Sequence, residues 1–206
     1  MNTSQLKIRK FENFVKRISE ESYPEPTSSI HTAITEKMIE SLIIHYSLPD
    51  KGRILDVGCG HGSALKLFHE KGFRAVGITI NREDFLACRE KGFEVHQMDQ
   101  TFIEFSDEEF DFVWCRHCLE HSFSPYLTLL ELSRVLKQKG YMYIEVPAPD
   151  TVSNHQANRN HYSVLGKSMW TELIKRSGFD LLDSSIITID LKIGQDVYWS
   201  FVIQKP

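Results

Sequence analysis

The sequence predicts an α/β protein built on a doubly wound, mostly parallel sheet. Apolar runs of strand length alternate with amphipathic segments of helix length from residue 53 to about residue 146, and glycines mark the short connections between them. The length of 206 residues suits one domain with a substantial core. We therefore expect a single domain over 1–206, divided into N-terminal helices (1–48), a core (49–147) and a C-terminal part (148–206).

The core is expected to alternate strands with helices. Gly72 and Gly92 each follow a lysine where a helix should end, and Pro125 stands just ahead of a third helix, as helix boundaries prefer. The expected strands cover 53–57, 74–80, 93–97, 110–115 and 141–146, and the expected helices cover 63–71, 83–91 and 126–136.

Further elements are expected on both sides of this core. An amphipathic N-terminal helix has an apolar side around Phe11 and Ile18, and a second helix should follow over 32–46. After Pro147 the periodic pattern lapses for roughly twenty residues, which is long for a connection without a function. The chain then predicts a helix over 169–177 capped by Ser168, and two antiparallel strands, 180–188 and 196–204, joined by a turn at 192–194.

Composition excludes several classes of function. The formal net charge of −4 and the lack of a basic run interleaved with aromatic residues argue against a nucleic-acid surface. The only cationic cluster fits the solvated side of the N-terminal helix; it comprises Lys7, Arg9, Lys10, Lys16 and Arg17. With no apolar stretch of membrane-spanning length and a polar start, the sequence predicts a cytoplasmic protein without a membrane span.

The four cysteines fall in or beside predicted buried elements. They are Cys59, Cys88, Cys115 and Cys118, and a disulfide framework is not expected in a cytoplasmic protein. Cys115 and Cys118 have C-x-x-C spacing, but no second pair exists to complete a zinc site. We interpret this spacing as a coincidence at the end of a strand.

A glycine-rich loop after the first strand is the most specific motif. The run Ile-Leu-Asp-Val-Gly-Cys-Gly-His-Gly places Gly58, Gly60 and Gly62 at alternate positions, so a ligand can lie against bare backbone. Asp56, just ahead of the loop, would repel a phosphate but would pair with an ammonium. The loop therefore favours a nucleoside that carries an amino acid.

These residues resemble the class I S-adenosylmethionine-dependent methyltransferases, and most closely their small "type 11" domains. The likeness covers roughly residues 50 to 147 and continues more weakly to residue 187. It includes Leu119-Glu120-His121 after the fourth strand, and Arg134-Val135-Leu136-Lys137 before a turn in which Gln138 and Lys139 replace the family's Pro and Gly. The resemblance implies a Rossmann-like sheet and S-adenosyl-L-methionine as cofactor.

The resemblance also assigns the cofactor-binding residues. Gly58, Cys59 and Gly60 would pack against the adenosine and the methionine part, and Asp56 would fix the loop or reach the α-ammonium through water. Thr79 stands where the family usually has a ribose-binding carboxylate, so Thr79 and Asn81 would bond the hydroxyls more weakly.

The strands that follow complete this set. Met98, Asp99 and Gln100 occupy the adenine-reading position of the family. Cys115 and Arg116 would lie under the methionine, where a backbone carbonyl accepts from the ammonium.

Catalytic candidates lie on two loops. His117 and His121 follow the fourth strand, and either imidazole could act as a base. His161 and Tyr162 belong to the long loop over 154–162, which we expect to act as a substrate lid together with His155. Should that loop serve the cofactor instead, acceptor recognition would fall to the N-terminal helices around Tyr23 and His31.

A divalent-metal site is a weaker interpretation. Glu120, His121, His155 and His161 resemble the ligand set of the RNA 3′-end methyltransferases. That family has a further carboxylate three residues before the glutamate, where this chain has His117. No metal is therefore expected.

The sequence as a whole predicts an S-adenosylmethionine-dependent methyltransferase acting on a small-molecule acceptor. One alternative is an RNA methyltransferase with a metal-assisted site. The other is a non-catalytic, cofactor-binding partner subunit, which Thr79 and the lack of a defined acceptor motif leave open. A homodimer is also left open, as is the nature of the acceptor atom.

Overall fold

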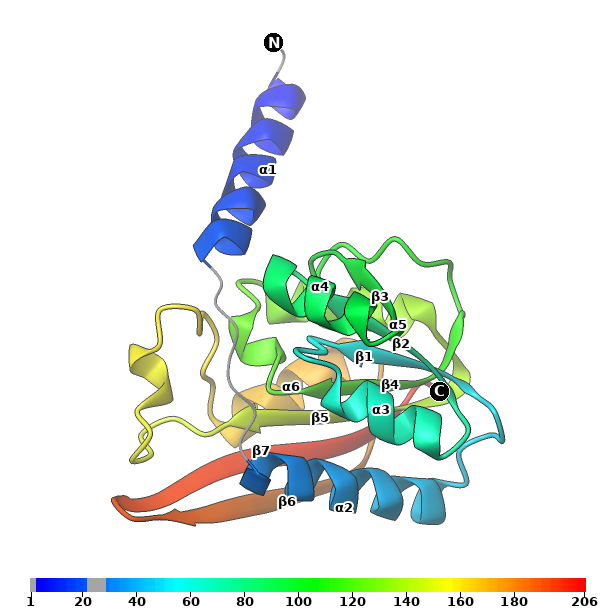
Figure 1. Cartoon of the computed structure of the whole chain (residues 1–206). Coiled ribbons are helices and arrows are strands. Elements are labelled where there is room, and N and C mark those ends of the chain that lie inside the picture. The colour runs from blue at the N-terminus through cyan, green and yellow to red at the C-terminus, as the bar shows by residue number, and fades with distance from the viewer. Residues whose placement is uncertain (1–2, 22–28) are drawn as a thin grey trace.

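A computed structural model describes residues 3–21 and 29–206 (Figure 1). At its centre is a seven-stranded sheet in the order β3-β2-β1-β4-β5-β7-β6, and β7 runs antiparallel to both of its neighbours. The strands are β1 (Arg53–Val57), β2 (Arg74–Thr79), β3 (Glu94–Gln97), β4 (Phe110–Arg116), β5 (Leu136–Pro147), β6 (Asp180–Leu191) and β7 (Gly194–Gln204). The prediction of a doubly wound, mostly parallel sheet with an antiparallel C-terminal strand is confirmed.

Helices cover both faces of the sheet. They are α1 (Thr3–Glu21), α2 (Ser29–Tyr46), α3 (Ser63–Glu70), α4 (Arg82–Glu90), α5 (Pro125–Val135) and α6 (Lys167–Arg176), with short 3-10 helices η1 (Leu119–His121) and η2 (His155–Ala157). Apolar side chains of α2 and α3 form one core with Ile54, Phe112 and Tyr143, whereas those of α5 and α6 form the other with Leu55 and Val113. Successive strand residues thus enter opposite cores, as period-two alternation requires.

The predicted boundaries agree with the structure to within a few residues, apart from three differences. Strand β5 begins at Leu136, before the predicted start, because Leu136 pairs with Phe110 ahead of a register shift in β4. The strands β6 and β7 extend further toward each other than predicted. Helix α6 is capped by Gly166 rather than Ser168, because the Gly166 carbonyl accepts from Met169 and Trp170.

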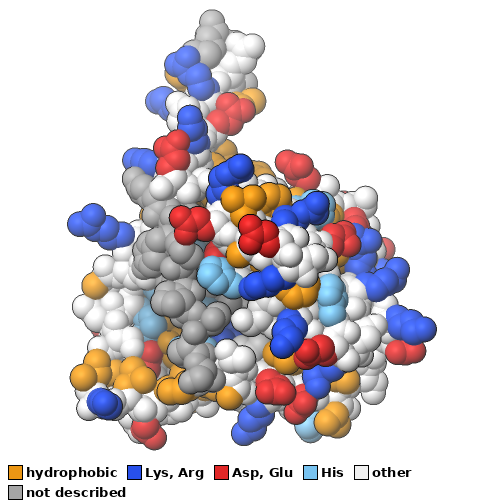
Figure 2. Space-filling model, in the orientation of Figure 1, with side chains coloured by type: hydrophobic (Ala, Val, Ile, Leu, Met, Phe, Trp, Pro, Cys, Tyr) orange, Lys and Arg blue, Asp and Glu red, His pale blue; other side chains and the backbone are white. Residues whose placement is uncertain are grey.

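Helix α1 extends away from the sheet (Figure 1). Its apolar side touches the body through Phe11, which packs against Phe102 and Phe123 at ring-centroid distances of 4.9 and 5.6 Å. The five basic residues of the predicted cluster are all exposed, which confirms their expected solvated position. Over the face visible in Figure 2, basic and acidic side chains are interspersed. None of the described helices is both long and apolar enough to cross a membrane.

The four cysteines are buried and unbridged.

Gly62 provides a test of how the fold holds the glycine loop. Its φ is +82°, and a Cβ there would lie 2.8 Å from the Phe93 ring, whereas Gly72 has a φ of +87° and no atom of the described part of the chain within 4 Å of its Cβ position. We expect Gly72→Ala to cost about 1 kcal/mol through backbone strain alone, and Gly62→Ala to cost about 2 to 3 kcal/mol because Phe93 must also move. Urea unfolding of both variants measures the difference; equal losses would contradict the role of Phe93.

Candidate functional site

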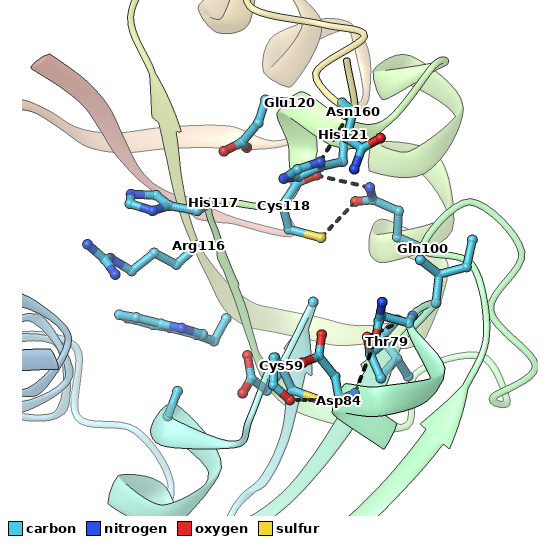
Figure 3. Close-up of a pocket in the computed structure, with 18 of the residues that line it drawn as sticks. Cys59, Thr79, Asp84, Gln100, Arg116, His117, Cys118, Glu120, His121 and Asn160 are labelled. Atoms are coloured by element: carbon cyan, nitrogen blue, oxygen red, sulfur yellow. Dashed lines mark hydrogen bonds between the residues drawn. The ribbon is translucent and has the colours of Figure 1, made fainter. Parts of the chain in front are cut away.

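A cavity of about 430 Å³ opens at the carboxyl ends of the strands, beside the point where strand order reverses between β1 and β4. Open α/β sheets bind ligands at this place. Every site residue predicted from the sequence lines the cavity except Cys115. Figure 3 shows a set of them, with Cys59, Thr79 and Asp84 on one side and Arg116, His117, Glu120 and His121 on the other.

The glycine loop is fixed to the neighbouring strand by its backbone. The amides of Gly58 and Cys59 both donate to the Ile78 carbonyl, at 2.9 and 3.0 Å. A Cβ on Gly60 would meet no atom of residues 3–21 or 29–206 within 4 Å, although Gly60 lines the cavity. The loop thus presents open backbone to the cavity.

Asp56 has a buried carboxyl at the end of β1. It is 2% exposed, and its Oδ2 atom has no hydrogen-bond partner among the described residues. Burial, together with the nearby Cys88 thiol, raises the pKa of Asp56 to about 8. The carboxyl is therefore largely protonated at neutral pH until a cationic group reaches it.

Polar groups line the end of β2. Thr79 is buried, and its Oγ1 accepts from the Asn81 amide at 3.2 Å. Asn81 caps α4, since its Oδ1 accepts from the amides of Glu83 and Asp84 at 2.8 and 3.1 Å. The oxygen of Asn81 is thus used at the start of the helix, while the residue still lines the cavity.

Asp84 is a cavity residue that sequence reasoning missed. Its carboxyl is 8% exposed, lines the cavity and lies 3.2 Å from Nε2 of His61. Asp84 is three residues after Asn81, which caps the helix, so it lies in the first helical turn beside the end of the preceding strand. This spacing in the sequence could have indicated that Asp84 lies at the cavity.

The loop after β3 is braced against the loop after β4 (Figure 3). Gln100 donates from Nε2 to the Cys118 carbonyl at 3.0 Å, and its Oε1 accepts from Cys118 Sγ at 3.4 Å. Asp99 forms a turn by accepting from the Thr101 amide at 2.7 Å. Met98 and Asp99 also line the cavity.

The side chain of Cys115 does not reach the cavity, so its expected place under the methionine concerns its backbone alone. Cys115 is fully buried in the core formed with α5 and α6, and it does not line the cavity. Residues alternate along β4, so Trp114 and Arg116 enter the cavity side while Cys115 enters the opposite core.

Glu145 of β5 has a buried carboxylate that joins three side chains beside the cavity. It accepts from His117 Nε2 at 2.7 Å and from the Tyr143 hydroxyl at 2.6 Å, and it forms an ion pair with Arg116 Nη2 at 2.8 Å. Burial alone would raise the pKa of Glu145, but these partners lower it to about 2. In the sequence, Glu145 is a charged residue inside an apolar strand, and this could have indicated that it has a functional role.

His117 and His121 are both held in their neutral forms. Burial lowers the pKa of each imidazole to about 4, although the hydrogen bond from His117 to Glu145 opposes the shift. His121 donates from Nδ1 to the Asn160 carbonyl at 3.0 Å, so its Nε2 atom retains a lone pair.

The long loop is anchored on β7 by Asp196. The carboxylate accepts from Thr151 Oγ1 at 2.8 Å, from Ser153 Oγ at 2.7 Å and from His155 Nε2 at 3.0 Å. From this anchored loop, His155, Asn158, Asn160, His161 and Tyr162 line the cavity. His31 of α2 lines it as well, whereas Tyr23 lies outside the described residues.

Three side chains form a candidate metal cluster. One ligand atom each from Glu120, His121 and His161 lies within 4.8 Å of the others. The four-residue set considered from the sequence is wrong in one member, because His155 binds Asp196. The donor set of two imidazoles and a carboxylate fits several divalent ions.

The lowered imidazole pKa values predict a pH-dependent stability. A histidine with a pKa of about 6.5 when unfolded and about 4 when folded stabilises the protein above pH 6.5, and this stability is lost as pH falls toward 4. Asn can keep the bond from position 121 to the Asn160 carbonyl without titrating. We expect His121→Asn to reduce the loss of unfolding free energy between pH 7 and pH 5 by about 2 kcal/mol. Urea unfolding at both pH values tests this, with the exposed His45→Asn as a control that leaves the loss unchanged.

Comparisons with known proteins identify the family of the chain. A family model described as a methyltransferase domain matches residues 32–184. The ubiquinone biosynthesis O-methyltransferase of Aliivibrio fischeri strain MJ11 is 22% identical over 87% of this chain and 76% of its own length. The glycine/sarcosine/dimethylglycine N-methyltransferase of Actinopolyspora halophila is 27% identical over 70% of this chain, but the match spans only 28% of that enzyme.

Solved structures share the fold at lower identity. An S-adenosylmethionine-dependent methyltransferase from Archaeoglobus fulgidus superposes with a TM-score of 0.64 at 22% identity, covering 82% of this chain and 94% of that one. The [4+2]-cyclase SpnF superposes with a TM-score of 0.68 at 17% identity, covering 83% and 81%. Because the family model spans most of the chain, the protein belongs to the methyltransferase-domain family and is a class I S-adenosylmethionine-dependent methyltransferase.

Proposed function

We propose that the protein methylates a small-molecule acceptor, and that Asp56 and the glycine loop hold the cofactor. The observation that carries this proposal is the buried Oδ2 atom of Asp56, which has no partner among the described residues and lies in a cavity that Gly60 leaves open. A cationic α-ammonium would satisfy that oxygen, and the open backbone accommodates a nucleoside.

The cavity offers a group for each part of S-adenosylmethionine. Thr79 and Asp84 would accept from the ribose hydroxyls, with Asp84 supplying the carboxylate that the end of β2 lacks. Met98 and Asp99 would contact the adenine. The backbone at the end of β4 would accept from the ammonium. When bound, the cofactor supplies an electrophilic methyl group, whose bond to sulfur breaks with the electron pair left on sulfur.

The acceptor would occupy the half of the cavity lined by imidazoles. His117, His121, His155, His161 and Tyr162 offer hydrogen bonds and aromatic surface, which suits a compact polar or aromatic molecule. The named relatives act on small molecules, by O-methylation in one case and N-methylation in another. The interspersed surface charge also gives no reason to favour RNA.

The cluster of Glu120, His121 and His161 favours one alternative, a methyl transfer assisted by a divalent ion. Turnover that disappears in EDTA and returns with added Zn²⁺, Mn²⁺ or Mg²⁺ would support it. Turnover that is indifferent to EDTA would support transfer by protein groups alone.

Calorimetry with S-adenosylhomocysteine tests the cofactor site. We expect the protein to bind this product, and Gly60→Val to abolish binding because the side chain fills the open space beside the loop. Gly72→Val is the matched control, since Gly72 also has a positive φ but lies outside the cavity. Absence of heat at millimolar ligand with the unaltered protein would overturn the proposal. A mass gain of about 14 Da, one CH₂, in a metabolite extract incubated with the cofactor then identifies the acceptor.

A second prediction follows from the raised pKa of Asp56. At pH 7 its carboxyl is largely protonated, so pairing with an ammonium should release close to one proton and affinity should rise between pH 6 and pH 8. Calorimetry in phosphate and in Tris counts the released protons. Asp56→Asn should abolish the release and weaken binding, whereas Asp99→Asn should release protons as the unaltered protein does. The same proton count with Asp56→Asn would show that Asp56 does not meet the ammonium.

A further inference from the structure

A buried carboxylate beside the cavity pairs with an imidazole of the cavity lining, and the proposed cofactor site uses neither side chain. Glu145 is fully buried, and the register of β4 and β5 places it directly beside Arg116. Its Oε1 accepts from His117 Nε2 at 2.7 Å and lies 2.8 Å from Arg116 Nη2, while its Oε2 accepts from the Tyr143 hydroxyl at 2.6 Å. Three donors therefore fix this carboxylate in one orientation.

His117 is in turn held from several directions. Its amide donates to the Glu145 carbonyl at 2.8 Å, and its ring stacks on Tyr198 with centroids 4.5 Å apart and planes 14° from parallel. Its φ is +52°, in the left-handed region that residues other than glycine seldom adopt. Such conformations persist where the surroundings enforce them, and they gather at functional sites.

The bond to Glu145 also determines the tautomer of His117. Because the carboxylate only accepts, Nε2 must carry the proton, and Nδ1 of the neutral ring keeps its lone pair. We propose that Glu145 is a positioning residue that makes His117 the general base for a hydroxyl acceptor. This inference rests on the proposed methyl transfer and names both its base and its class of acceptor.

The proton balance explains why the acceptor is a hydroxyl. A neutral amine attacks through its own lone pair and can lose its proton afterwards, whereas a hydroxyl is a weak nucleophile until a base takes its proton. As the new oxygen–carbon bond forms, the hydroxyl proton would pass to Nδ1 of His117. The resulting imidazolium would lie against the Glu145 carboxylate, which stabilises it.

His121 lacks this arrangement. Its Nδ1 atom donates to the Asn160 backbone carbonyl and not to a carboxylate, and the Glu120 carboxylate lies within 4.8 Å of a ring nitrogen only as part of the candidate metal cluster. Arg116 balances the negative charge of Glu145 without displacing His117. Its guanidinium is also held by Thr35 Oγ1 and His31 Nδ1, each at 3.2 Å.

Nitrogen NMR of histidine-labelled protein tests the positioning without any acceptor. We expect a single Nε2-protonated tautomer for His117 at pH 7, with its signals assigned by their loss in His117→Gln. Glu145→Gln should give a mixture of tautomers, because an amide can either donate or accept. Since that variant leaves Arg116 buried without its counter-charge, the double variant Arg116→Gln/Glu145→Gln provides a neutral pair with the same expectation. An Nδ1-protonated ring in the unaltered protein, or an unchanged tautomer in both variants, overturns the proposal.

Kinetics with the acceptor found by the mass-gain assay test the catalytic role. His117→Ala should lower kcat by about 10² to 10⁴, and Glu145→Gln by about tenfold or more. In a His117→Ala background, Glu145→Gln should cause no further loss, since a positioning residue acts only through its partner. Equal losses in both backgrounds, or an acceptor methylated on nitrogen or carbon, overturn the proposal. The S-adenosylhomocysteine dissociation constant should stay within about threefold in His117→Ala and in Glu145→Gln; failure of the unaltered protein to bind it would count against the proposed function instead.

Discussion

Strand alternation is the constraint on which the site depends. Only one side chain in two along β1, β4 and β5 enters the face covered by α2 and α3, and at the carboxyl ends these positions hold Asp56, Arg116 and Glu145. A shift of one residue in any of these strands would place the charged groups in the opposite, fully apolar core. The register of the sheet therefore determines that charged side chains lie at the cavity.

The two buried carboxyls on this face show how neighbours determine protonation. Asp56 has no cationic partner among the described residues and holds its proton to about pH 8, whereas Glu145 has Arg116 and two hydrogen-bond donors and ionises at about pH 2. Both are almost completely inaccessible to water. Asp56 is therefore available to an incoming cation, whereas Glu145 already holds Arg116, His117 and Tyr143 in place beside the cavity.

Much of the fold could be read from the sequence, because hydrophobic periodicity and glycine positions are local signals. The glycine loop and the strand ends likewise led to residues that do meet in one cavity. The roles that the sequence did not reveal belong to groups whose partners lie far away in the chain or whose local role was overlooked: the Cys115 side chain enters the core opposite the cavity, the Asn81 oxygen caps a helix, and His155 binds Asp196. Glu145 was missed because its meaning depends on a strand neighbour almost thirty residues away in the chain, a pairing that no local pattern reveals.

The anchoring of the long loop on Asp196 has a consequence for the order of assembly. Thr151, Ser153 and His155 find their common acceptor only after β7 has been synthesised and paired with β5. The groups proposed to hold the methyl donor, in contrast, all lie between Asp56 and the end of β4 at Arg116, well ahead of β7 in the chain. On the ribosome the nucleoside end of the cavity can thus form while the imidazole-lined end still awaits the last residues of the chain, so the nascent protein would acquire a place for its methyl donor before a place for the molecule to be methylated.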